Sequence, residues 1–174
     1  MPLNEAYCGS VMFFTLMKNC NEDQWEQTID VNCKGCVNGI GAALPGFLER
    51  GAGHIVCTSS DASRRMFPTL AVYCGSKQFI DAVCEGTRRE LVGTGVKVTV
   101  IQPGDVAGTE LIMQNSDNEA ADKMGVAINK PVGEGFNKFQ LLQAQDIADA
   151  VIYAVTAPAH VAVNEILIEP RDQE

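Results

Sequence analysis

The sequence predicts a single α/β domain, a parallel sheet with helices on both faces. Two patterns support this prediction: helix-like and strand-like segments alternate along the chain, and each strand-like segment is short and apolar. The length of 174 residues and the hydrophobic content of 46% suit one domain with a sizeable core. We therefore expect residues 1–174 to fold as one unit whose parallel strands are joined by right-handed crossovers.

The first expected helix is long and amphipathic. Apolar residues recur at spacings of three and four over residues 25–44. We expect Asn21 to cap this helix, with Gln24 as its capping-box partner, and the helix to end near Gly51. The next segment, residues 53–58, is a short apolar run followed by a Ser-Ser-Asp cluster, which is typical of a buried strand that leads into a loop.

A second helix and a second strand follow. The helix is expected to begin near Tyr73 and to stop at Gly93. Residues 96–101 are rich in β-branched side chains, and Pro103 follows them, which a helix could not continue through. This segment is therefore expected to be a strand.

The last third of the chain begins irregularly. Residues 109–140 contain scattered glycines, and we expect at most short helices there. A third helix is expected around residues 147–155, and a last strand over residues 165–168. Ligands of such sheets bind beyond the carboxyl ends of the strands, so chemistry is expected just after residues 58 and 101.

Charge and hydropathy exclude several classes of partner. The chain has 22 acidic against 13 basic residues, a formal net charge of −9, which disfavours nucleic acid and anionic lipid. No apolar run approaches the length of a membrane span, and no positively charged segment precedes the apolar residues 11–17 as in a secretory signal. We expect a cytoplasmic protein without nucleic-acid or membrane partners.

The seven cysteines permit two interpretations. Cys33 and Cys36 have the spacing of a redox or zinc motif. No second cysteine pair accompanies them, and His54 and His160 are the only histidines of the sequence. The favoured hypothesis is reduced, buried thiols, and no metal site is expected.

One set of polar residues suggests chemistry. Tyr73 and Lys77 stand four residues apart, on one face of the expected second helix. Ser60 precedes Tyr73 by 13 residues, and Asn32 precedes Ser60 by 28 residues. Together with the Pro-Gly-Asp-Val-Ala-Gly-Thr run at residues 103–109, this set resembles the short-chain dehydrogenase/reductase family. The resemblance extends from about residue 11 to the C-terminus and is strongest to branches acting on 3-hydroxy acids or serine-type substrates.

The resemblance implies a Rossmann-like fold and an NAD(P)-dependent oxidoreductase that interconverts a secondary alcohol and a carbonyl compound. The cofactor would be NADP or NAD, the substrate a small alcohol or carbonyl compound, and the assembly a homo-oligomer formed through the two long helices. In that family Tyr73 would transfer the proton, Lys77 would also hold the nicotinamide ribose, and Ser60 would bind the substrate oxygen. Asn32 would complete a proton relay through a water. The residues implied to line the nicotinamide, in addition to Tyr73 and Lys77, are Pro103, Gly104, Val106 and Thr109.

The pairing of Tyr73 with Lys77 also has a physical basis. A phenol must shift its pKa from ~10 to ~7 to serve as a general acid and base at neutral pH, which corresponds to roughly 4 kcal/mol. An ammonium ~4 Å away supplies about that energy at an effective dielectric constant of ~20. We therefore expect Lys77 to lower the pKa of Tyr73.

One family feature is absent from the sequence. No Gly-rich G-x-x-x-G-x-G turn for the cofactor pyrophosphate precedes the first expected helix, and the Tyr-Cys-Gly-Ser run at residues 7–10, which repeats residues 73–76, is followed by Val11 instead of a lysine. We expect an N-terminally truncated fold in which residues 53–58 form an exposed sheet edge. Uncovering ~400 Å² of apolar surface there costs on the order of 10 kcal/mol.

Two hypotheses of function remain open. The chain is either an oxidoreductase, with poor turnover by the isolated chain until the missing segment is added, or a catalytically silent relative that binds a partner protein. Dinucleotide binding discriminates between them, because only the oxidoreductase must hold NAD(P)H.

Overall fold

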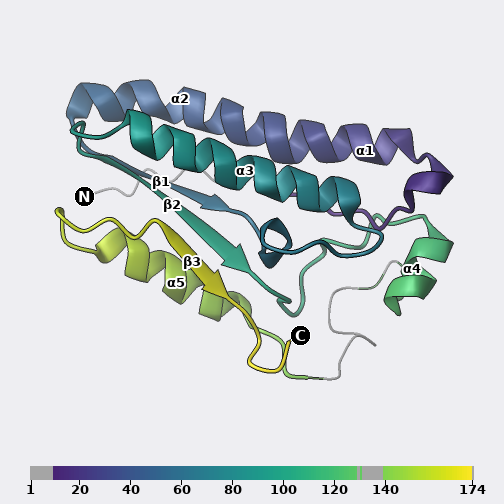
Figure 1. Cartoon of the computed structure of the whole chain (residues 1–174). Helices are drawn as coiled ribbons and strands as arrows, with labels where there is room; N and C mark the ends of the chain where they lie inside the picture. Colours follow the sequence, from purple (N-terminus) through teal and green to yellow (C-terminus); the bar gives the residue numbers. More distant parts are fainter. Residues whose placement is uncertain (1–9, 129, 131–138, 174) are drawn as a thin grey trace.

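The computed structural model describes residues 10–128, 130 and 139–173, and it contains one parallel sheet (Figure 1). The strands are β1 (Gly53–Thr58), β2 (Val96–Pro103) and β3 (Glu165–Ile168). Their order is β1-β2-β3, and both pairings are parallel. The register pairs Gly53 with Val96 and Thr58 with Ile101, so the carboxyl ends of β1 and β2 lie side by side. The prediction of a parallel α/β fold is confirmed.

Helices cover both faces of the sheet and complete three layers. Figure 1 shows α2 and α3 over one face and α5 under the other, with α4 beside the start of α1. The helices are α1 (Glu22–Thr28), α2 (Gly35–Arg50), α3 (Ala71–Glu90), α4 (Asn118–Met124) and α5 (Ala144–Thr156). No helix in the described part of the chain is long and apolar enough to cross a membrane.

The long first helix is not continuous, which differs from the prediction. Residues Ile29–Lys34 between α1 and α2 form a π-helical segment, which has more residues per turn than an α-helix. Thr28, Asn32 and Cys36 are therefore buried at a constant spacing of four, whereas Ile29, expected on the apolar stripe, is 45% exposed. The wider turn therefore buries Thr28 and Asn32 in place of Ile29 and Cys33, the neighbouring residues of the predicted stripe.

The predicted helix cap is also wrong. Asn21 makes no side-chain cap hydrogen bond; its Nδ2 donates to Asp117 Oδ2 at 3.0 Å. Gln24 Nε2 donates to Ser116 Oγ at 2.9 Å and does not complete a capping box. The reason is a tertiary contact: the Asp117 carboxylate, from a distant segment, is a stronger hydrogen-bond acceptor than a neutral group would be.

Two apolar clusters form the core. The first lies between the β1–β2 pair and helices α2 and α3, and it contains Ile55, Val98 and Val100. The second joins Phe14 and Leu70 to α4 and to the first turn of α3. The second cluster anchors the segment that precedes α1 beside the carboxyl end of the sheet.

Asp117 fixes the irregular region, in which α4 is a short helix as predicted. Its carboxylate accepts hydrogen bonds from Ala120 N at 3.0 Å, which caps α4, and from Leu16 N at 3.1 Å. The Asn19 and Asn21 amides donate to it as well. One carboxylate thus joins α4 to the residues before α1.

Replacing Ile55 with alanine is expected to lower the free energy of unfolding by about 2–5 kcal/mol, because the side chain is fully buried in the first cluster. Ile152→Ala is the matched control, since Ile152 is 54% exposed on α5 and its loss should cost less than about 0.5 kcal/mol. Urea unfolding followed by circular dichroism measures both. Equal losses in the two variants would contradict the assignment of the core.

Acid is expected to loosen the attachment of α4 through Asp117. Burial acts to raise the pKa of this carboxyl, but the Ala120, Leu16 and asparagine hydrogen bonds outweigh it and hold the pKa below its ordinary value. A carboxylate with a depressed folded-state pKa contributes stability above its unfolded pKa of ~3.9 and loses it as the pH falls. Asp117→Asn should therefore show a shallower loss of stability between about pH 5 and pH 3 than the parent chain. A slope unchanged from the parent chain would refute this role.

Candidate active site

A cavity of about 1040 Å³ opens beyond the carboxyl ends of β1 and β2, where the sequence predicts chemistry. The first turns of α3 and one side of α5 complete its wall. Its lining includes every predicted site residue except Asn32: Ser60, Tyr73, Lys77, Pro103, Gly104, Val106 and Thr109.

The end of β1 positions Ser60. Ser59 N donates to Ile101 O at 2.7 Å, which extends the parallel ladder by one residue past β1. Ser60 is extended, and its Oγ accepts a hydrogen bond from Ala62 N at 3.1 Å, which caps the short 3₁₀ turn Asp61–Ser63. The same hydroxyl donates to Asp61 Oδ1 at 2.9 Å. The serine is therefore held between a strand end and a turn.

Tyr73 meets Ser60 from the first turn of α3. Both residues line the cavity, and Tyr73 is 5% exposed. Burial raises the pKa of Tyr73 well above its ordinary value; the Ser60 hydrogen bond opposes this, and the charges of Asp61 and Asp105 add to it. This direction is opposite to the sequence expectation, because desolvation and two carboxylates outweigh the effect expected from Lys77.

Lys77 lies one turn further along α3 and is 1% exposed. Its Nζ is 5.4 Å from the centre of the Tyr73 ring and donates to Thr58 O at 3.2 Å. Burial lowers the pKa of Lys77 to about 8, while the charge of Asp81 acts in the opposite direction. The ammonium form therefore still predominates at neutral pH.

Asn32 lies next to this group without entering the cavity. Its Oδ1 accepts from Val11 N at 2.9 Å, and its Nδ2 donates to Val11 O at 2.9 Å and to Ser76 Oγ at 3.0 Å. Ser76 Oγ in turn donates to Tyr73 O at 2.7 Å. The side chain is thus occupied in joining the π-helical segment to the first turn of α3, and both of its amide hydrogens are used.

The loop after β2 forms the opposite wall. Gly104 N donates to Ile168 O at 2.8 Å, and Asp105 N donates to Gln173 Oε1 at 3.0 Å. A Cβ at Gly104 would lie 2.5 Å from Gln173 Oε1, so a larger residue there would displace the Gln173 side chain. Thr109 Oγ1 donates to Val106 O at 3.4 Å. Contacts with the C-terminal segment hold the start of this loop in place.

Residues 8–120 match the family model for short chain dehydrogenases. This chain belongs to the short-chain dehydrogenase family. It is 48% identical over 166 residues to the glycine betaine reductase of Emericella nidulans, a match that covers 95% of the chain and 12% of that protein. It is 38% identical to an uncharacterized oxidoreductase of Staphylococcus saprophyticus, over 91% of the chain and 60% of the relative.

Solved structures agree with the family assignment. A serine dehydrogenase complexed with NADP+ superposes with a TM-score of 0.81 at 31% identity, over 95% of this chain and 63% of that one. The Escherichia coli serine dehydrogenase gives 0.77 at 27% identity, over 99% of this chain and 66% of that one. The chain therefore spans less than two thirds of each of these relatives.

Sequence reasoning missed two carboxylates in this short-chain dehydrogenase. Asp61 accepts hydrogen bonds from Ser60 Oγ and, at 2.8 Å, from Gln173 Nε2, and it is 5% exposed. Asp105 is half-buried, and burial, with a further contribution from Asp61, raises the pKa of Asp105 to about 6. Both follow strand ends, which was the available signal, but only the fold shows that they flank Tyr73.

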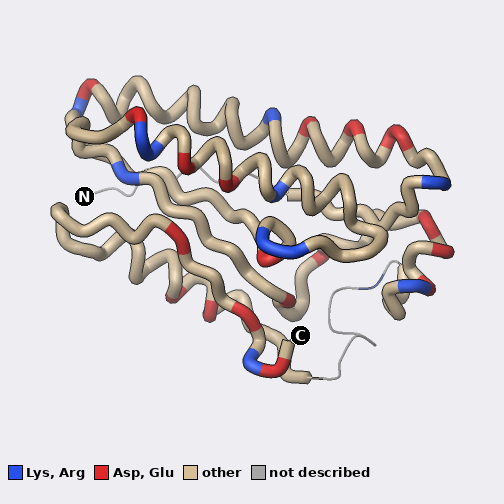
Figure 2. Tube along the Cα trace, viewed as in Figure 1, with Lys and Arg blue, Asp and Glu red and all other residues tan. Residues whose placement is uncertain are grey.

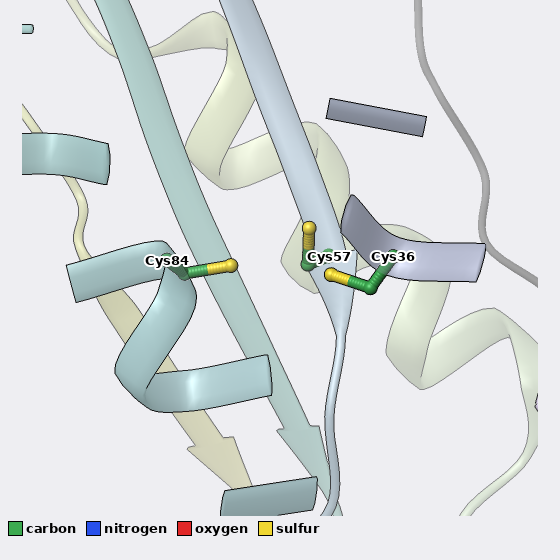
Figure 3. Close-up of side chains that lie close together, drawn as sticks. All are labelled: Cys36, Cys57 and Cys84. Carbon is green, nitrogen blue, oxygen red and sulfur yellow. The ribbon is translucent and has the colours of Figure 1, made fainter. Parts of the chain in front are cut away.

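The cysteines lie mainly in the core. Cys36, Cys57 and Cys84 converge from α2, β1 and α3 (Figure 3), and their sulfur atoms lie within 4.8 Å of one another. Hydrogen bonds with Cys36 and Cys84, together with burial, raise the pKa of Cys57 far above its ordinary value, so it remains a thiol. Cys33 is only half-buried and is not part of this cluster. The arrangement favours the hypothesis of buried thiols over a Cys33–Cys36 motif.

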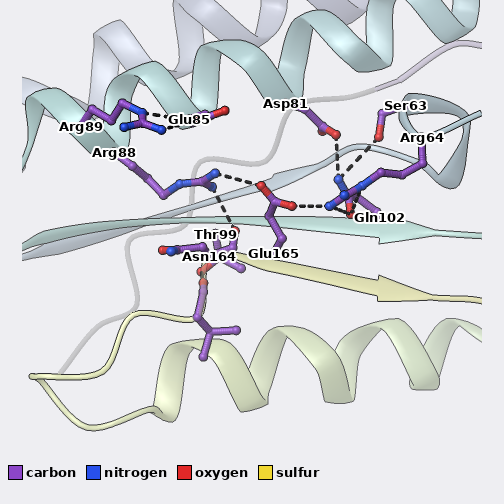
Figure 4. Close-up of polar contacts among 11 residues, drawn as sticks. Ser63, Arg64, Asp81, Glu85, Arg88, Arg89, Thr99, Gln102, Asn164 and Glu165 are labelled. Atoms are coloured by element: carbon purple, nitrogen blue, oxygen red, sulfur yellow. Dashed lines mark hydrogen bonds and ion pairs between the residues drawn. The ribbon is translucent and has the colours of Figure 1, made fainter.

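A polar network joins α3 to the sheet and to the turn after β1 (Figure 4). Gln102, fully buried on β2, accepts from Arg64 at 3.0 Å and donates to Asp81 Oδ2 at 2.7 Å. Arg64 and Arg88 both pair with Glu165 at the start of β3. The network connects the turn after β1, helix α3 and strands β2 and β3 around the site.

Replacing Lys77 with methionine is expected to stabilise the chain at pH 7 by about 1–3 kcal/mol, because a change of one in pKa corresponds to ~1.4 kcal/mol and burial depresses the pKa of Lys77 to about 8. The unfolded chain binds more protons than the folded chain between about pH 8 and pH 10, so the stability of the parent chain rises with pH there. The advantage of Lys77→Met should shrink over that range. Urea unfolding at several pH values tests this, and a destabilised variant at pH 7 would contradict it.

Proposed function

We propose that this chain carries the catalytic groups of an NADP- or NAD-dependent oxidoreductase that interconverts a small alcohol and a carbonyl compound. The observation that carries the proposal is that Ser60, Tyr73 and the buried Lys77 ammonium line one cavity beyond the carboxyl ends of β1 and β2. Family membership and the likeness to a serine dehydrogenase complexed with NADP+ support it.

The residues present fit the nicotinamide half of such a cofactor. Lys77 carries three donor hydrogens and makes one hydrogen bond, to Thr58 O, so it has capacity for a ribose hydroxyl. The loop from Pro103 to Thr109 faces it across the cavity and would contact the nicotinamide, with Thr109 near its carboxamide. When bound, the reduced cofactor supplies a hydride to the carbonyl carbon.

Side chains of the protein would bind and protonate the oxygen of the substrate. Ser60 Oγ would redirect its single hydrogen, which it donates to Asp61 in this structure, to the carbonyl oxygen, and Tyr73 would transfer its proton to that oxygen as the alcohol forms. Lys77 stabilises the phenolate left behind, and solvent returns the proton, so that one carbonyl compound, one reduced cofactor and one proton give one alcohol and one oxidised cofactor. Burial keeps Tyr73 protonated at neutral pH, so the proton that reduction requires is present on the phenol.

Asn32 would act as a positioning residue. Its contact with Ser76, whose hydroxyl binds Tyr73 O, fixes the first turn of α3 and hence the aim of Tyr73. Both amide hydrogens of Asn32 are already donated, to Val11 O and Ser76 Oγ. A water that relays protons from Lys77 would therefore bind to main-chain groups of the π-helical segment and not to the Asn32 amide hydrogens.

The long helices support a homo-oligomer, and with it the alternative of a silent partner-binding chain. Large apolar side chains are exposed on α2 and α3 and on the π-helical segment: Ile29, Val37, Leu48 and Phe79. Self-association through these helices is compatible with activity, so it does not separate the two hypotheses. Dinucleotide binding does.

Two relatives are named for small zwitterions, glycine betaine and serine, each of which carries a cationic nitrogen and a carboxylate. The size of the cavity suits a substrate of that scale beside the nicotinamide.

Tyr73→Phe is expected to reduce carbonyl reduction by about 10²- to 10⁴-fold while leaving NADPH affinity nearly unchanged, because it removes only the transferable proton. Fluorescence titration with NADPH and NADH, followed by an assay of cofactor oxidation with small aldehydes, measures both quantities. Tyr153→Phe is the matched control, since Tyr153 is 66% exposed on α5 and lies outside the cavity lining. Full turnover by Tyr73→Phe would refute the catalytic assignment, and absence of any dinucleotide binding would favour the silent alternative.

A further inference from the structure

The described residues that line the cavity carry an excess of negative charge. The lining contains one ammonium, Lys77, and four carboxylates, of which Asp172 is paired with Arg171: Asp61, Asp105, Glu110 and Asp172. Glu110 and Asp172 are exposed at the rim, whereas Asp61 and Asp105 lie inside. Figure 2 shows acidic residues in the loop after β2 and near the C-terminus, on this side of the sheet. The proposal that the cavity is a reaction site does not depend on this charge, because it is based on Ser60, Tyr73 and Lys77.

The two inner carboxylates act on the reacting atoms. Both lie close enough to Tyr73 for their charges to affect its ionisation, and Asp61 is hydrogen-bonded to Ser60. They also repel each other, as the effect of Asp61 on Asp105 shows. A positive group bound between them would relieve this repulsion.

Nearby arginine does not neutralise them. Arg65 NH2 lies 3.2 Å from Asp61 Oδ2 and also pairs with Glu169. Three carboxylates, Asp61, Asp105 and Glu169, therefore share one guanidinium at this wall. The remaining negative charge acts within a partly enclosed, low-dielectric space, where charges interact more strongly than in water.

Aromatic rings supply the rest of the recognition surface. The lining includes five aromatic residues: Phe13, Phe14, Phe67, Tyr73 and Phe139. Arg65 already lies over the Phe67 ring and Lys77 over the Tyr73 ring, which leaves the other three for a ligand. Aromatic faces attract organic cations, and quaternary ammonium groups are recognised in this way. An anionic substrate would gain nothing from the rings and would be repelled by the carboxylates.

We propose that the site takes a small carbonyl compound, or its alcohol, that bears a positively charged ammonium group, with Asp61 and Asp105 as the specificity-determining residues. The proposal rests on the proposed function and adds the substrate class to it. It ranks cationic substrates above neutral ones and neutral ones above carboxylates, which separates this site from the hydroxy acids suggested by the sequence resemblance.

A pair of isosteres isolates the charge. Choline and 3,3-dimethylbutan-1-ol have the same shape and differ in a quaternary nitrogen against a quaternary carbon. Titration calorimetry of the full chain should show choline binding at least about tenfold more tightly. Asp61→Asn and Asp105→Asn keep the shape of each side chain and should bring the ratio toward one. Asp149→Asn is the control: it removes a negative charge from α5, the helix that lines the cavity, at an exposed position outside the lining, and should leave the ratio unchanged.

The outcomes separate this inference from the function on which it rests. Equal or tighter binding of the neutral alcohol, no binding of either, or a ratio unmoved by both asparagine variants would overturn the ligand class. The corresponding two aldehydes are then assayed with NADPH. Equal reduction of both aldehydes would retain the oxidoreductase and overturn the inference. A choline preference without hydride transfer to either aldehyde would retain the recognition of cations and remove the proposed function.

Discussion

The parallel register between β1 and β2 is the constraint on which the site depends. Because both strands run in the same direction and end together, Ser60 and Pro103 emerge side by side, and Ser60 Oγ lies 3.5 Å from Pro103 O. Helix α3 packs across this pair of strands, so its first two turns bring Tyr73 and Lys77 over the same edge. A slip of one residue would turn Ile55 and Cys57 out of the core and move Ser60 away from Tyr73.

The fold accepts an energetic cost to hold this arrangement. Lys77 is almost fully buried beside a single carbonyl acceptor, which no purely structural core would favour. The Gln102 amide, held by Arg64 and Asp81, places a carboxylate one helical turn beyond Lys77, and that charge offsets part of the desolvation. The network and the buried lysine therefore act together: burial of Lys77 lowers the stability of the fold, and in return an ammonium group is held near Tyr73.

Local patterns in the sequence were sufficient for the strands and for the Tyr73–Lys77 pair. Strands 53–58 and 165–168 match their predicted bounds, because short apolar runs between turn residues depend little on distant contacts. The π-helical segment and the true partner of Asn21 could not be predicted, because both follow from contacts with residues 11 and 117, far away in sequence. Asp61 and Asp105 belong to the same category: each looks like an ordinary loop residue until the register places them around one hydroxyl.

The charges around Tyr73 connect substrate recognition to chemistry. Burial, Asp61 and Asp105 all hold the pKa of the phenol above its usual value, so the phenol stays protonated but is a weak acid. A cation bound against the two carboxylates would cancel their contribution and make the phenol a stronger acid at the moment when a carbonyl oxygen is in place. A carboxylate substrate would add a third negative charge and weaken the acid further. The same two side chains would thus select the substrate and adjust the acid that reacts with it, which gives a role to the buried aspartate that directly follows Ser60 in this chain.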